Sequence, residues 1–226
     1  MAPVFGAPLI FFGEDLGIGE GTRLLSFPNA LAARNSFLAN LVGVGTENFE
    51  GFADDTGAPL SLTFPGSSGS ITATLTGTGA TNEVVSGTNG VGRYPTSGNI
   101  YWESGQTFAI QFSAPVAAFG FYGIDIGDFG GQLTVTRNSG AITTFTVPNT
   151  VNGSGGGVLF WGIIDQADPF TQVAFGNTAA GTDFFGFDDM TVGDVEQVNI
   201  VPEPGTYAML GAGLLALGLL RRRKQQ

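Results

Sequence analysis

Cysteine and histidine are both absent from this sequence of 226 residues. Without cysteine the chain has neither a disulfide framework nor a thiol nucleophile, and without histidine it has no Ser-His-Asp triad. A zinc site of the usual Cys/His type is excluded for the same reason. The missing cysteines also mean that stability has to come from the hydrophobic core.

Basic residues are scarce ahead of the last 25 residues. Residues 1–201 contain 18 acids and four bases, which gives a net charge of −14, and they contain no lysine. The four bases are Arg23, Arg34, Arg93 and Arg137. Nucleic acids and anionic lipid surfaces need cationic contacts, so we expect no nucleic-acid partner, whereas divalent cations and neutral polymers remain compatible with this charge.

Short strands dominate the pattern of the middle of the chain. The 37 glycines and 20 phenylalanines, with few charges, are typical of many short strands joined by tight turns. One helix is predicted over residues 28–41, and residues 77–99 are predicted to form a polar loop. No helical pattern separates the strands, so an antiparallel β-sandwich over residues 13–195 is favoured over a parallel βαβ sheet. The predicted strands are residues 60–64, 71–75, 108–112, 116–124, 133–137, 142–147, 158–164, 171–175 and 184–192.

The amino-terminal residues 1–12 are apolar but short, and no Lys or Arg precedes the apolar stretch. A secretory signal normally has a longer apolar region after a basic start. We therefore interpret residues 1–12 as the remnant of a truncated or misassigned signal, and residues 13–27 as an extended lead-in to the domain.

The carboxyl-terminal end has three parts in a fixed order. A linker at 196–204 contains Pro202-Glu203-Pro204, an uncharged run follows at 205–220, and Arg221, Arg222, Arg223 and Lys224 follow the run. As a helix the run would be about 24 Å long, slightly short of a hydrocarbon core of about 30 Å. A buried core helix is therefore an alternative, but the adjacent cations favour a transmembrane helix with residues 221–226 as a basic cytoplasmic tail.

This three-part end resembles the PEP-CTERM sorting signal of Gram-negative bacteria. The resemblance implies that a membrane-embedded exosortase recognises Pro202, Glu203 and Pro204 and cleaves nearby. The basic cluster matches the membrane stop of such signals. The protein would then be exported, held briefly in the inner membrane and the lipid bilayer, and passed to the cell surface, extracellular matrix or exopolysaccharide. Phrases at 27–52, 118–135 and 184–192 also look like those of exported PEP-CTERM proteins, which implies a jelly-roll or galactose-binding-like β-sandwich.

Acidic residues gather at predicted strand ends, and Ca²⁺ binds carboxylate and carbonyl oxygens. Glu50, Asp54, Asp188 and Asp189 in these clusters are the candidate ligands. The phrases around Glu50 and at Asp188-Asp189 resemble those of jelly-roll domains, which often hold a calcium ion where the first strand meets the last. The alternative is that these residues are ordinary solubilising turn residues.

Sugar binding requires exposed aromatic faces beside polar groups, and Tyr101, Trp102 and Trp161 are the candidates. Burial in the core is the alternative for each of them. The sequence as a whole predicts a structural or adhesive surface protein rather than an enzyme. A carbohydrate-binding module is the alternative, and a glycan hydrolase, which would use two carboxylates, comes third.

Overall fold

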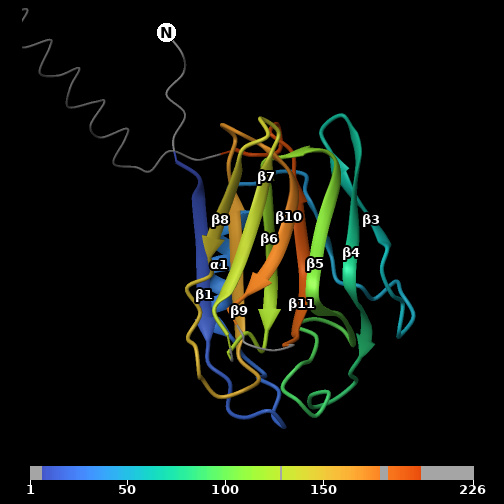
Figure 1. The fold of residues 1–226 in the computed structure, drawn as a ribbon, viewed down its shortest axis with the longest axis vertical. Coiled ribbons are helices and arrows are strands. Elements are labelled where there is room, and N and C mark those ends of the chain that lie inside the picture. Colours follow the sequence, from blue (N-terminus) through green and yellow to red (C-terminus); the bar gives the residue numbers. More distant parts are fainter. Residues whose placement is uncertain (1–6, 128, 179–182, 200–226) are drawn as a thin grey trace, which may run out of the picture.

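The computed structural model describes residues 7–127, 129–178 and 183–199, which form an antiparallel sheet of eleven strands with one helix (Figure 1). Along the main path the strand order is β1-β9-β6-β11-β5-β10-β7-β8, while β2 pairs with β11, and β3 is joined to β5 through β4. The elements are β1 (Leu9–Asp15), α1 (Pro28–Leu38), β2 (Gly45–Glu47), β3 (Leu60–Gly66), β4 (Gly69–Glu83), β5 (Ile100–Val116), β6 (Ala118–Ile124), β7 (Gly131–Arg137), β8 (Ile142–Thr146), β9 (Val158–Ile164), β10 (Phe170–Asn177) and β11 (Phe185–Gly193).

Strand β5 changes partner along its length and so curls the sheet. On one side it pairs with β4 from Ile100 to Phe112, while on the other Trp102 lies opposite Phe187 of β11 and Phe108 lies opposite Phe175 of β10. The two wings of the sheet therefore face each other. Their phenylalanines meet in the core, with 5.2 Å between the ring centroids of Phe121 and Phe175 and 5.5 Å between those of Phe175 and Phe187.

The central strands β6 and β9 are buried along their whole length. One face of this pair belongs to the aromatic core, and α1 packs on the other. Phe37 of α1 fits against Gly120 and Gly162, which are opposite each other in the register, because a Cβ atom on either glycine would lie about 3 Å or less from the Phe37 ring. These apolar runs need cover on both faces, which explains the position of the helix.

The predicted mainly β, antiparallel fold with one short helix near the amino terminus is confirmed. The helix ends at Leu38 rather than at residue 41, because Leu41 leaves it to form a bridge with Val198. The jelly-roll or galactose-binding-like topology stays a prediction.

Two segment boundaries differ from the prediction. Residues 9–12 belong to β1, where Leu9 to Asp15 pair with β9 in full register, so the domain starts before residue 13. A truncated signal ahead of β1 stays a prediction. Residues 77–83 are strand rather than loop, because β4 continues past a bulge and pairs with the first residues of β5. In both cases the pairing partner is distant in sequence, so local polarity gave no indication of it.

No helix within the described residues is long and apolar enough to span a membrane. The predicted transmembrane helix at 205–220 lies outside the described residues, as do the Pro-Glu-Pro motif and the basic cluster.

Candidate functional site

Two adjacent carboxylates, Asp188 and Asp189, occupy a bulge in β11 where the register with β6 shifts. Asp188 is completely buried, and its Oδ2 accepts hydrogen bonds from the Thr96 amide (2.7 Å), the Thr96 hydroxyl (2.8 Å) and the Ser97 amide (3.2 Å). Asp189, which has a positive φ of 49°, accepts a bond of 3.0 Å from the Ser97 hydroxyl. The pair therefore fixes the segment that precedes β5 against the sheet.

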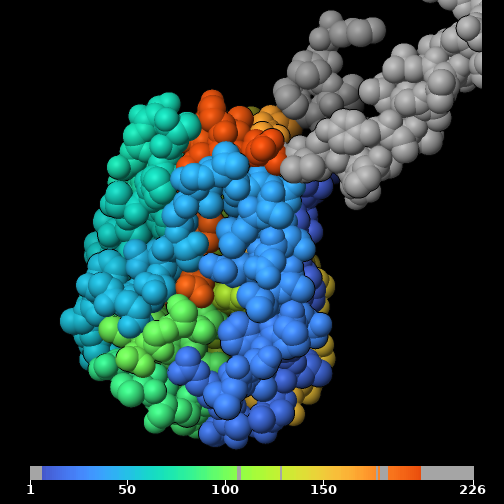
Figure 2. All heavy atoms as spheres, turned by 180° about the vertical axis from the view of Figure 1, so that it is seen from behind, coloured from blue at the N-terminus to red at the C-terminus, as the bar shows by residue number. Residues whose placement is uncertain are grey.

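Burial and the neighbouring charge of Asp189 raise the pKa of Asp188 to about 8, although its hydrogen bonds act in the opposite direction. Burial also raises the pKa of Asp189, against hydrogen bonds and the attraction of Arg34. Two such carboxyl groups hold a proton more tightly than isolated ones. Burial disfavours the charged form of each, and ionisation of one disfavours ionisation of the other. Figure 2 shows an opening on this face, between the light-blue segment and the green segment, through which atoms of the orange-red segment containing β11 are visible.

The other two predicted metal ligands are used elsewhere. Glu50 accepts hydrogen bonds from the amides of Asn99 (2.7 Å) and Ile100 (2.6 Å), and Asp54 accepts one from the amide of Glu83 (2.9 Å). Both are exposed. Among the residues that the structure describes, no three acidic side chains come together as a possible metal site, so the predicted four-carboxylate set does not assemble. Calcium binding stays a prediction.

The three aromatic residues considered as candidates for sugar binding are buried, so the structure agrees with the alternative of burial in the core. Tyr101, Trp102 and Trp161 are each 0% exposed. The Tyr101 hydroxyl donates to Glu103 at 3.0 Å, the Trp102 ring stacks on that of Phe108, and Trp161 packs on β6 and β8 residues. The Trp102 ring is covered by Phe49, which is distant in sequence, and by Phe108, and local sequence could not reveal this packing.

A groove that the sequence did not indicate lies beside the acidic pair. Its volume is about 610 Å³, and Thr96, which binds both carboxylates, is part of its lining. Leu25 and Val85, two strongly exposed aliphatic side chains (94% and 69%), border it together with Phe27 and Arg23. The groove is large enough for a small ligand, since ligand sites commonly enclose about 300–1,000 Å³. Its residues come from loops without periodicity, which is why no pattern predicted it.

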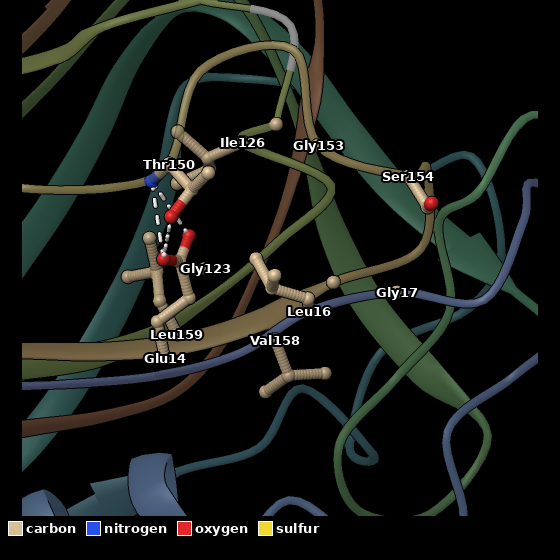
Figure 3. Close-up of a pocket in the computed structure, with 12 residues that line it drawn as sticks. Glu14, Leu16, Gly17, Gly123, Ile126, Thr150, Gly153, Ser154, Val158 and Leu159 are labelled. Carbon is tan, nitrogen blue, oxygen red and sulfur yellow. Dashed lines mark hydrogen bonds between the residues drawn. The ribbon is translucent and has the colours of Figure 1, made fainter.

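A second hollow lies between the end of β1 and the segment ahead of β9 (Figure 3). Its volume of about 10 Å³ admits about one water molecule. Glu14 closes one side by accepting hydrogen bonds from the amide and hydroxyl of Thr150, at 2.8–3.1 Å. This contact ties the loop ahead of β9 to strand β1, and the hollow is too small for a substrate.

Comparison with known proteins gives one finding. Neither a search of curated proteins nor one of solved structures returned a match. A family model, the PEP-CTERM protein-sorting motif, matches residues 201–224 and therefore covers Pro202 to Lys224. The chain thus carries the PEP-CTERM sorting signal of an exported protein that is processed by an exosortase.

Proposed function

We propose that this protein is a structural or adhesive component of the extracellular matrix or biofilm, delivered by its sorting signal and associated there with exopolysaccharide. The observation that carries the proposal is the position of the sorting motif, which starts at residue 201, three residues after Val198, a buried residue of the domain that forms a bridge with Leu41. The domain is then the cargo that reaches the surface. In this proposal it is a β-sandwich that acts without catalysing a reaction.

The geometry of the domain supports display from one end. Leu9 of β1 lies opposite Ile164 of β9, Ile164 lies opposite Ala118 of β6, and Ala118 lies opposite Gly193 of β11. Leu9 and Gly193 are therefore in the same row across the sheet. The domain therefore begins and ends at the same pole (Figure 1). The loops at 16–27 and 84–99 lie at the opposite pole and carry exposed aliphatic residues, so they would face away from the surface.

Processing tests the sorting part of the proposal. Changing Glu203→Gln, or deleting residues 221–224, should leave an uncleaved, membrane-held form in fractionated cells, identified by its intact mass. Glu196→Gln is the matched control, because Glu196 is an exposed acid just upstream of the motif. Normal cleavage of the Glu203 variant would contradict recognition through this motif.

Carbohydrate binding is the second candidate function, and the groove between Leu25 and Val85 favours it. Apolar walls beside the hydroxyl groups of Thr22, Ser86 and Thr96 suit a sugar ring, which has an apolar face and a polar rim. This moves the expected sugar site from the buried tryptophans to the groove, with Phe27 as the available aromatic side chain.

A glycan array probed with the full chain tests this second candidate. We expect retention to be lost in the Phe27→Ala and Val85→Asp variants and kept in Ile142→Asp, whose side chain is similarly exposed but lies on β8. Equal retention by all three variants would exclude the groove as the binding site.

A further inference from the structure

Among the residues that the structure describes, strands β1, β2, β3 and β8 each pair on one side only, and three of them carry a feature that disfavours further pairing. β1 ends in two acids, β2 has three residues and one acid, and β3 contains Pro65. Charges, prolines and very short strands are the usual ways to block an open edge. β8, with the sequence ITTFT, has neither a charge nor a proline.

The backbone of β8 offers free hydrogen-bonding groups on its open side. The Arg137 amide donates to the carbonyl of Ala141, and the Val147 amide donates to the carbonyl of Gly131. In the register of β7 and β8 these residues lie directly opposite each other, Arg137 with Ala141 and Gly131 with Val147. Hydrogen-bonded pairs alternate along an antiparallel ladder, so Thr143 and Phe145 point their backbone groups toward β7. Those of Ile142, Thr144 and Thr146 consequently point away from it.

The charge distribution favours this edge for contact between copies of the chain. Residues 1–201 have a net charge of −14, which makes most surfaces of two copies repel each other. No charged residue occurs between positions 138 and 164, the stretch that contains all of β8. The side chain of Ile142 is 68% exposed there, so pairing would also cover apolar surface.

We infer that β8 is a self-association site, at which the β8 strands of two copies pair antiparallel about a twofold axis at Thr144. In this register Thr144 lies opposite itself and Ile142 lies opposite Thr146 of the second copy. The outward-facing residues then exchange up to about six backbone hydrogen bonds, and the sheet continues from one copy into the other. A twofold pair of identical edge strands has to be antiparallel, because each strand meets the same surface of its partner.

This geometry determines how the two copies face each other. β8 begins opposite Thr136, near the pole at which the domain begins and ends, and runs toward the opposite pole (Figure 1). In the antiparallel pair one copy is rotated by 180° relative to the other. The poles at which the two domains end, and from which their sorting segments continue, therefore point in opposite directions. The contact therefore joins copies displayed on two facing surfaces, a consequence that rests on the proposed adhesive function, whereas the pairing itself does not.

A five-residue strand pair buries less surface than a stable dimer interface of about 1,200–2,000 Å². We therefore expect a weak contact that becomes effective where many copies are displayed together and the effective concentration is high. Cross-linking is the suitable measurement, because it captures a weak contact of defined geometry.

The cysteine-free sequence makes the cross-linking experiment specific. Thr144→Cys in the full-length chain, purified in mild detergent and oxidised, should give a disulfide-linked dimer, since paired Cα atoms about 5.5 Å apart suit a disulfide. Ile142→Cys and Thr146→Cys should each remain largely monomeric alone and cross-link when mixed. Cross-linking of Ser139→Cys, an exposed position outside β8, is the background level.

A proline provides the second test. In the mixture of Ile142→Cys and Thr146→Cys, adding Thr144→Pro to both chains should reduce the dimer at least tenfold without lowering the melting temperature much. An edge strand tolerates proline where its N–H faces outward. Dimer yields at background level for every β8 variant, or yields unaffected by Thr144→Pro, would overturn the proposal. Neither readout depends on processing or polysaccharide, so failure here is distinguishable from failure of the proposed function.

Discussion

The β6–β9 pair and β8 are built from similar short antiparallel strands, but they differ in what covers them. Every residue of β6 and β9 is buried, by the aromatic core on one face and by α1 on the other, whereas no residue of β8 is fully buried. The centre of the sheet therefore supplies stability, while the edge is available for interaction. The same β propensity serves both purposes, because burial depends on what packs against a strand rather than on the strand.

The largest expected effect is the loss of the helix contact at the centre. Phe37→Ala removes a completely buried ring that packs against Phe11, Phe160 and two glycines, and should lower the free energy of unfolding by about 3–5 kcal/mol. Urea unfolding of the full chain measures this. Leu31→Ala, on the exposed side of the same helix, should cost less than about 1 kcal/mol, and an equal cost for both would contradict the difference between the two faces.

The acidic pair next to the centre should make stability depend on pH. The folded-state pKa of Asp188 is about 8 and its ordinary value is 3.8, so the contribution of this group to stability is greatest when it is protonated in both states and is lost as the pH rises through 8. Between pH 6 and pH 9 this corresponds to a loss of roughly 2–3 kcal/mol. The melting temperature should fall over that interval. Asp189→Asn removes the neighbouring charge and should make the melting temperature less dependent on pH. A fall as steep as in the unchanged chain would contradict a contribution of the Asp189 charge to the raised pKa of Asp188.

A smaller effect is expected from filling the slot that receives Phe37. A Cβ atom on Gly162 would lie 3.0 Å from the Phe37 ring and 3.1 Å from that of Phe160. Gly162→Ala should therefore destabilise the domain by about 1–3 kcal/mol through overpacking. The control is Gly21→Ala, because no atom lies within 4 Å of a Cβ placed there. Comparable melting temperatures for the two variants would show that the slot can relax.

The smallest expected effect is at the edge. Ile142→Thr changes an exposed side chain and should alter the free energy of unfolding by no more than about 0.5 kcal/mol, measured at a low protein concentration. A larger loss at low concentration would mean that β8 also stabilises the isolated domain, and the distinction between centre and edge would fail.

Much of the fold could be predicted from the sequence. The predicted strands at 116–124 and 158–164 correspond to β6 and β9, and those at 60–64, 133–137 and 142–147 correspond to β3, β7 and β8. Residues 9–12 were missed because strand β1 is recognisable only beside its partner β9. The candidate site was harder, since Asp188 and Asp189 were singled out but their partners Thr96 and Ser97 lie more than 90 residues away.

The sequence by itself determined the sorting signal, the absence of thiol and imidazole chemistry, the acidic charge and the antiparallel β character. These properties reside in composition or in patterns of a few neighbouring residues. Only the tertiary structure decided that the tryptophans are buried, that two aspartates hold a distant loop, and that β8 lies at an edge of the described sheet. Exposure, proton affinity and free hydrogen-bonding groups all depend on which distant segments pack together, because long-range contacts determine what solvent can still reach.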